Sequence, residues 1–111
     1  MEAPSKSGIV LVRFPVSDLS RSKLRPAVVL ADAGRGDHVI CQVTSKPYGD
    51  PSAVVLDNTA LASGSLRVTS YARPGKLFTA SSDLVTELVG VLTDEARGRI
   101  VDAVVAVICG E

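Results

Sequence analysis

The segment with the clearest chemical potential is residues 22–30, which read SKLRPAVVL. Lys23 and Arg25 precede a proline, and apolar residues typical of a buried strand follow it. Because proline cannot donate to a sheet ladder, we predict that Pro26 opens this strand. The residue before a proline is held in extended backbone, so the Arg25 side chain would leave the rim of a sheet in a restricted direction. Such a guanidinium could bind two oxygens of a phosphate or carboxylate, although on these residues alone a solvated arginine is the simpler interpretation.

Other polar side chains also lie where strands are expected to end. Thr44, Ser45 and Lys46 follow one predicted strand, and residues 73–76 (RPGK) separate two others. The net charge is zero, yet residues 1–80 carry a balance of +4 and residues 81–111 a balance of −4. A protein that binds duplex DNA over many phosphates is usually basic overall. The charge pattern therefore favours only a local anion site, suited to a short single strand.

Several classes of enzyme are excluded by what the sequence lacks. It contains no glycine-rich phosphate loop and no Cys/His cluster with the spacing of a zinc site. His38 is the only histidine and is interpreted as structural, which excludes a ribonuclease mechanism that needs two histidines. We expect no metal and no cofactor. Cys41 and Cys109 are interpreted as reduced packing residues. No signal peptide and no apolar run of about 18 residues is present, which predicts a cytoplasmic protein without membrane contact.

Length and patterning predict one domain over residues 1–111, mainly β with one helix. Thr93 is a good N-cap, Asp94 and Glu95 suit the positive end of a helix, and Gly110 fits its end. An apolar stripe at helical spacing comprises Ile100, Val101, Val104, Val105 and Ile108. Short strands followed by one amphipathic helix favour a small curled β-barrel with the helix packed on it. We expect strands at 8–14, 27–30, 38–44, 53–56, 66–71 and 76–79, with 87–92 either a last strand or a short helical turn.

Taken in order, these segments resemble the MazF/PemK/Kid-like toxins of bacterial toxin–antitoxin pairs. The matching segments, which extend over nearly the whole chain, are 8–15 (GIVLVRFP), 22–30 (SKLRPAVVL), 42–45 (QVTS), and 73–79 (RPGKLFT) leading into 88–93 (LVGVLT). The resemblance implies a Src-homology-3-like curled β-barrel with a C-terminal helix, assembled as a homodimer. It also implies a sequence-specific, metal-independent endoribonuclease (an mRNA interferase) that cleaves single-stranded RNA. A cognate antitoxin would neutralise it by covering the RNA groove, and operator DNA would be bound only through that antitoxin.

The resemblance also assigns the site residues. It makes Arg25 and Thr44 the catalytic pair, and the residues that would line the RNA site are Ser22, Lys23, Ser45, Lys46 and Arg73. RNA cleavage by its own 2′-hydroxyl needs in-line geometry and stabilisation of charge on the phosphorane oxygens. Arg25 could supply that stabilisation bidentately. Because the pKa of arginine lies above ~12, we prefer this role to proton transfer. Thr44 could donate a hydroxyl hydrogen bond to a non-bridging oxygen, and no general base is assigned.

Two departures from the family pattern keep an alternative open. Relatives often carry a glutamate in the loop where this chain has residues 20–22 (SRS), and several have an aspartate where it has Gly75. The alternative is a catalytically weakened toxin-like barrel that acts as an antitoxin- or RNA-binding module. A third reading is a barrel that recognises a peptide or nucleic acid without toxin ancestry.

Overall fold

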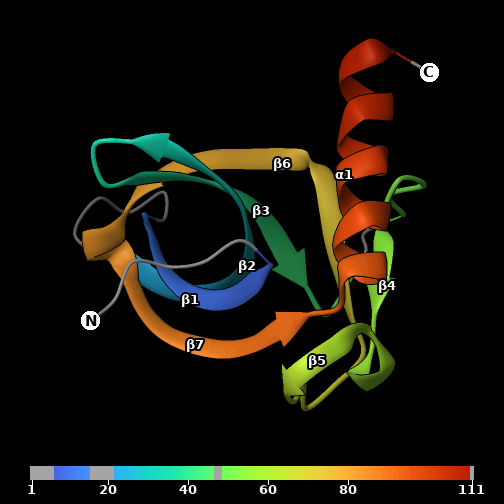
Figure 1. The fold of residues 1–111 in the computed structure, drawn as a ribbon, viewed down its shortest axis with the longest axis horizontal. Helices are drawn as coiled ribbons and strands as arrows, with labels where there is room; N and C mark the ends of the chain where they lie inside the picture. The colour runs from blue at the N-terminus through green and yellow to red at the C-terminus, as the bar shows by residue number, and fades with distance from the viewer. Residues whose placement is uncertain (1–6, 16–21, 47–48, 111) are drawn as a thin grey trace.

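The computed structural model describes residues 7–15, 22–46 and 49–110. In this part of the chain seven strands form one antiparallel sheet in the order β4-β6-β3-β2-β1-β7-β5, and the sheet curls around on itself (Figure 1). One helix, α1, packs beside the curled sheet and makes most of its contacts with β6 and β4. The predicted fold class, a small curled β-barrel with a C-terminal helix, is confirmed. The elements are β1 (Gly8–Pro15), β2 (Ser22–Gly34), β3 (Asp37–Thr44), β4 (Val54–Leu56), β5 (Leu61–Gly64), β6 (Ser70–Ser81), β7 (Val85–Leu92) and α1 (Asp94–Cys109), with 3-10 turns η1 (Asn58–Ala60) and η2 (Ser82–Leu84).

The central strands β1 and β2 are buried on both faces, which explains their nearly continuous apolar sequence. Successive residues of a strand point to opposite faces. Ile9 and Val28 therefore join one apolar cluster, which also contains Ala96 and Ile100 of α1. The residues next to them along each strand point to the other face and join a second apolar cluster with residues of β3, β6 and β7. This cluster comprises Val10, Val12, Ala27, Val29, Ile40, Ala80 and Val85. The two clusters fix β1 and β2 as the rigid centre of the sheet.

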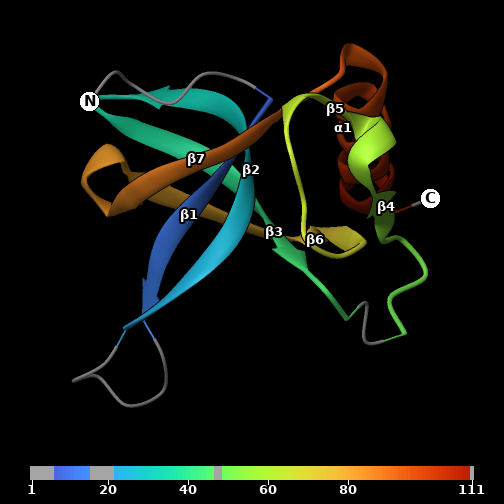
Figure 2. The same ribbon diagram turned by 90° about the horizontal axis from the view of Figure 1, so that it is seen from below.

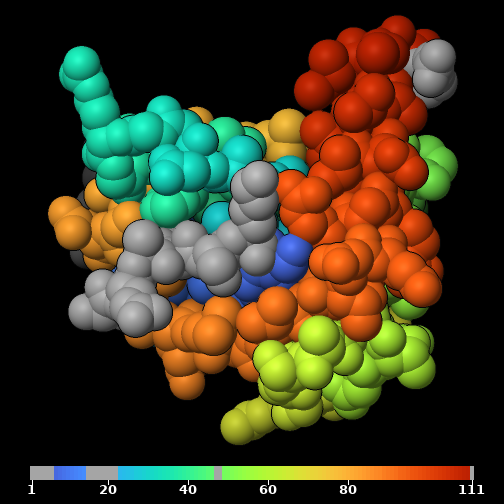
Figure 3. All heavy atoms as spheres, viewed as in Figure 1, coloured from blue at the N-terminus to red at the C-terminus, as the bar shows by residue number. Residues whose placement is uncertain are grey.

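Helix α1 begins and ends as the sequence predicts, but it is only partly buried. The Thr93 side chain accepts a hydrogen bond from the Ala96 N–H at 3.1 Å, and Gly110 ends the helix in the left-handed conformation. The last turns project beyond the sheet (Figures 1 and 3), leaving Val105 51% and Ile108 72% exposed. The predicted apolar stripe thus continues past the surface that it packs on. Among the described residues, no helix is both long and apolar enough to cross a membrane.

The strand boundaries predicted at two prolines are wrong, and β2 also continues past the predicted end at Leu30 to Gly34. Strand β2 begins at Ser22 and runs through Pro26, so Arg25 lies within a strand rather than before one. Proline is tolerated there because β3 pairs with β2 only as far as Ala27, and at Pro26 the register gives β2 a single neighbour, β1. Similarly, residues 73–75 lie inside β6 instead of separating two strands.

The remaining strand predictions have mixed outcomes. Strand β4 was expected, and the ambiguous segment 87–92 belongs to strand β7. Most of the strand predicted at 66–71 is wrong, because β6 starts only at Ser70. The four-residue strand β5 was not predicted, since its sequence LASG has no apolar alternation.

The two cysteines lie in opposite environments. Cys41 is fully buried in the first apolar cluster, as expected, whereas Cys109 is exposed at the projecting end of α1, so its interpretation as a packing residue is wrong. Burial raises the pKa of the Cys41 thiol to about 12. Only the thiolate is an effective nucleophile, so the two thiols should differ in reactivity.

The close approach of β5 to β7 generates the first prediction. Gly64 has φ +80° and a Cβ there would lie 2.4 Å from the Val89 carbonyl oxygen, whereas Gly34 has φ +88° and open space around it. Alanine at either position costs about 1–2 kcal/mol for the left-handed backbone. We expect Gly64→Ala to lower the free energy of unfolding by clearly more than Gly34→Ala, as measured by urea titration. Equal losses of unfolding free energy would show that the β5 backbone can move away from β7 without cost, contradicting the tight approach.

The second prediction concerns thiol reactivity. With an aromatic disulfide reagent at pH 8, and at a protein concentration too low for self-association, we expect the native protein to react at one thiol per chain, Cys109, and the urea-unfolded protein to react at two. A Cys109→Ser variant should then be inert until it is unfolded. Rapid reaction of the native Cys109→Ser variant would contradict the burial of Cys41.

Candidate functional site

Strands β2 and β3 separate at one end of the sheet and form a fork. They pair from the turn at Gly34 and Asp37 as far as Ala27 and Gln42. Beyond that point β2 stays with β1, while β3 stays with β6, and Figure 2 shows the two strands diverging. Arg25 and Thr44 each lie two residues past the last pair, one on each arm. The structure therefore brings to the two arms of one fork the two residues that the sequence analysis selected as catalytic.

The same face of the sheet carries both side chains. Arg25 shares its face with Ala27, and Thr44 shares its face with Gln42, by the alternation of residues along a strand. Since Ala27 and Gln42 are directly paired, Arg25 and Thr44 point to the same side. The Arg25 backbone pairs with Val12, a residue of the second apolar cluster, and the Arg25 side chain is half-buried. The Arg25 side chain is therefore less exposed than that of an arginine at a solvated strand end.

Thr44 is held at the turn that follows β3. Its Oγ1 accepts a hydrogen bond from the Lys46 N–H at 3.1 Å. A hydroxyl that accepts one hydrogen bond still has its own hydrogen to donate. The Ser45 and Lys46 side chains that follow are exposed. The turn thus fixes the Thr44 oxygen and leaves polar groups in solvent beside it.

Arg73 lies on β6, next to the Thr44 arm of the fork. Thr44 pairs with Tyr71, and Arg73 follows two residues later in an irregular stretch of β6. Its Nε donates to Asp50 Oδ2 at 3.1 Å, and the two side chains are 21% and 14% exposed. The Ser52 N–H and the Arg73 side chain lower the pKa of the Asp50 carboxyl. Sequence reasoning missed Asp50, and no signal could have found it, because 23 residues separate the partners.

Two other predicted site residues lie on β2. Lys23 shares the face of Arg25, pairs with Phe14 and is exposed. Ser22 starts the strand opposite Pro15, and its backbone alone is described. Ser20 and Arg21 lie outside the described residues. All seven predicted residues are thus on, or directly after, three neighbouring strands, namely β2, β3 and β6.

His38 lies at the opposite end of β3 from Thr44. His38 is 3% exposed, and its Nε2 lies 2.9 Å from Ser82 Oγ, which donates to the Gly36 carbonyl. His38 therefore donates to Ser82 and ties the β2–β3 turn to η2. Within residues 7–15, 22–46 and 49–110, no group of three His, Cys, Asp or Glu side chains could hold a metal ion.

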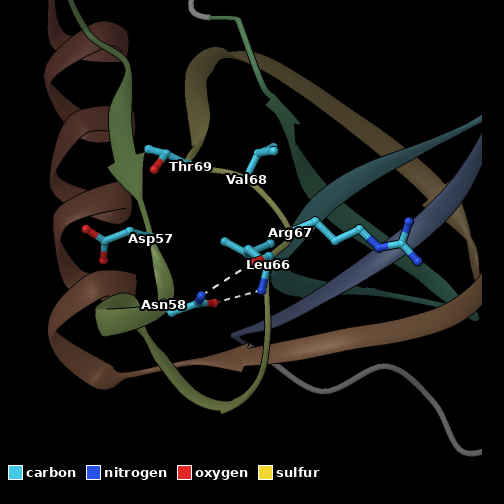
Figure 4. Close-up of a pocket in the computed structure, with 6 residues that line it drawn as sticks. All are labelled: Asp57, Asn58, Leu66, Arg67, Val68 and Thr69. Atoms are coloured by element: carbon cyan, nitrogen blue, oxygen red, sulfur yellow. Dashed lines mark hydrogen bonds between the residues drawn. The ribbon is translucent and has the colours of Figure 1, made fainter.

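Two hollows in the surface lie elsewhere than on the face of the fork that carries Arg25 and Thr44. A pocket of about 170 Å³ is lined by residues 57–58 and 66–69 (Figure 4), where the Asn58 side-chain amide holds both backbone groups of Leu66. A groove of about 480 Å³ includes Leu11 and Pro26, which face away from Arg25. Neither hollow contains Arg25 or Thr44.

Comparison with known proteins supplies the family. A family model for the PemK-like, MazF-like toxin of type II toxin-antitoxin systems matches residues 5–108. No curated protein sequence is significantly similar to the chain.

Solved structures share the fold at low sequence identity. A MazF structure from Deinococcus radiodurans has a TM-score of 0.76 and 19% identity, over 100% of both chains. A MazE–MazF complex from the same organism has a TM-score of 0.75 and 19% identity, over 99% of this chain and 98% of that one. An endoribonuclease in complex with its cognate antitoxin, from a mycobacterial species, has a TM-score of 0.70 and 18% identity, over 99% and 96%. With the family match over almost its full length, the chain belongs to the PemK-like, MazF-like toxins of type II toxin–antitoxin systems.

Proposed function

We propose that this protein is a toxin that cleaves single-stranded RNA at short sequences, without a metal ion, by attack of the RNA 2′-hydroxyl. The observation that carries the proposal is the placement of Arg25 and Thr44 on one face of the fork between β2 and β3. Proteins of the same fold include a mycobacterial endoribonuclease. An RNA substrate would place the activity in the cytoplasm.

Each residue at the fork has a role that its chemistry supports. The Arg25 guanidinium is planar and can bind two phosphorane oxygens at once. The Thr44 hydroxyl can donate to one of the same two non-bridging oxygens, since its own oxygen already accepts from the Lys46 N–H and its hydrogen is left to donate. The RNA backbone is bound by cations on the three strands, and the serines add hydroxyl donors. These supporting residues are Ser22, Lys23, Ser45, Lys46 and Arg73.

A catalytically weakened binding module is the second candidate. One observation favours it: the irregular stretch of β6 carries Gly75 where several relatives have an aspartate. Such a protein would bind the antitoxin or RNA without turnover. The two candidates differ in one measurable property, the dependence of RNA cleavage on Arg25.

The proposed partners are a cognate antitoxin and a second copy of the chain. The similar structures include MazE–MazF complexes and an endoribonuclease in complex with its cognate antitoxin. An acidic antitoxin segment would be attracted by the same cations as RNA, so a saturating antitoxin should stop cleavage. Uninhibited cleavage in the saturated complex would contradict a shared groove.

Operator DNA would be bound only through the antitoxin. Homodimer formation would cover the apolar end of α1 that the monomer exposes.

The third prediction tests the enzyme. In excess EDTA, the wild type should cleave a single-stranded RNA mixture to products with a 2′,3′-cyclic phosphate and a 5′-hydroxyl. Arg25→Ala should lower the rate at saturating RNA by roughly 10²-fold or more, as expected for loss of a main oxyanion donor. Arg25→Lys should rescue little, because the point charge of an ammonium group cannot reproduce the two parallel hydrogen bonds of the planar guanidinium. Thr44→Val should cost less than Arg25→Ala, and Thr44→Ser should retain most activity.

The matched control for the third prediction is Arg99→Ala, which removes an exposed arginine from the opposite end of the sequence, on α1. It should cleave like the wild type. Equal cleavage by Arg25→Ala and the wild type would remove Arg25 from the mechanism. No cleavage by any variant, together with tight antitoxin binding, would favour the binding module.

The fourth prediction tests the dimer. Ile108→Asp places a charge in the exposed apolar end of α1, so we expect it to weaken self-association at least tenfold, as measured by sedimentation. Val68→Asp alters a side chain of similar exposure, 58%, away from α1, and should sediment like the wild type. A wild-type protein that sediments as a monomer at high concentration would contradict the dimer.

A further inference from the structure

The loop carboxylate Asp50 contacts Arg73, one of the cations in the proposed RNA site. We propose that Asp50 is a positioning residue for RNA cleavage, which holds the Arg73 guanidinium in a fixed orientation beside the Thr44 arm of the fork. The inference rests on the proposed function. It adds a residue that neither the sequence patterns nor the family resemblance selects.

Asp50 has an orientation of its own, set by the loop that carries it. Its Oδ1 accepts a hydrogen bond from the Ser52 N–H at 2.9 Å, and its backbone carbonyl accepts from the Ala53 N–H at 3.3 Å. This turn leads directly into β4, the neighbour of β6. The second carboxylate oxygen, Oδ2, meets Arg73 Nε. A carboxylate held in this way is an acceptor placed in advance, rather than a surface charge that follows the arginine.

Arg73 is held at its backbone as well as at its guanidinium. The preceding residue, Ala72, is fully buried and pairs with Val43 on one side and Val54 on the other. The Arg73 carbonyl accepts a hydrogen bond from the buried Cys41 thiol at 3.2 Å. An arginine side chain has large rotamer freedom, and fixing both ends removes most of it. The position of the cation is therefore set before any ligand arrives.

That position is next to the fork. Tyr71 pairs with Thr44, and Arg73 lies two residues farther along the same strand. A cation fixed there would meet the RNA backbone close to the hydroxyl of Thr44. Because small displacements of a positioning group can cost up to about 10²-fold in rate, loss of the Asp50 contact should slow the chemical step.

The charge of Asp50 has the opposite effect on binding, and this separates the possible roles. A carboxylate beside the site repels RNA phosphates, so its removal should leave RNA affinity unchanged or raised. A positioning role thus predicts slower turnover with equal or tighter binding. A residue that merely competes with RNA for Arg73 would give faster turnover with tighter binding when it is removed. A residue that only stabilises the fold would change neither per folded molecule.

The experiment compares Asp50→Asn with the control Asp57→Asn. Asp57 is also a loop carboxylate, and it accepts a hydrogen bond from the Thr59 N–H at 2.9 Å, away from the fork. We measure kcat and KM with a cleavable RNA and Kd with the same strand carrying a 2′-deoxy residue at the cleavage position. For Asp50→Asn we expect kcat to fall about tenfold and Kd to stay equal or decrease, whereas Asp57→Asn should match the wild type in both.

A double-mutant cycle tests whether Asp50 acts through Arg73. In an Arg73→Gln background, Asp50→Asn should cause no further loss of kcat. Additive losses, a rise in kcat, or unchanged kcat with a lowered Tm would each overturn the proposal. A wild type that cleaves no RNA would overturn the proposed function instead. In that case, hydrogen exchange of the Arg73 Nε–H, measured by NMR, still tests whether Asp50 holds the guanidinium. The Nε–H should exchange slowly with solvent in the wild type and in Asp57→Asn, and rapidly in Asp50→Asn.

Discussion

The change of partners along strand β2 is the constraint on which the rest of the site depends. Residues 22–26 of β2 pair with β1 alone, residues 27–28 pair with both β1 and β3, and the rest of the strand, as far as Gly34, pairs with β3 alone. β2 loses its pairing with β3 between Ala27 and Pro26. Strand β3 separates from β2 there and stays paired with β6. A strand with one neighbour tolerates a proline that a fully paired strand would not. Because Val12 and Ala27 are packed into the second apolar cluster, Arg25 leaves the sheet from a rigid base.

An irregularity in β6 matches this fork on the other side. Between the pairs Cys41–Leu77 and Val43–Ala72, β3 advances two residues while β6 advances five. The extra residues of β6 bend the strand, as bulges do, and Figure 1 shows it turning toward α1. They also put Arg73 beside the Thr44 arm, with its carbonyl held by the Cys41 thiol. Fork and irregularity together gather polar side chains from three strands at one end of an otherwise apolar sheet.

Low identity to the similar structures is compatible with this arrangement. At 19% identity, few individual side chains are shared, yet a core needs only apolar residues of suitable volume at alternating positions. The sheet therefore tolerates wide substitution. Site chemistry is less tolerant, because a guanidinium or a hydroxyl has no apolar equivalent. In this chain the carboxylate beside Arg73 comes from Asp50, in a loop before β4, and Gly75 supplies none.

The sequence alone determined the features that depend on neighbouring residues. Alternation along the chain predicted most strands, and helical spacing predicted α1. Thr93 and Gly110 marked the ends of α1, because caps are made within one turn. Ordered motifs selected Arg25 and Thr44. Only the tertiary structure decided which partner each part of β2 takes, that β6 continues through residues 73–75, that Asp50 meets Arg73 and that Ile108 stays exposed. Pairing and burial join residues that lie far apart in the chain, and no local pattern records them.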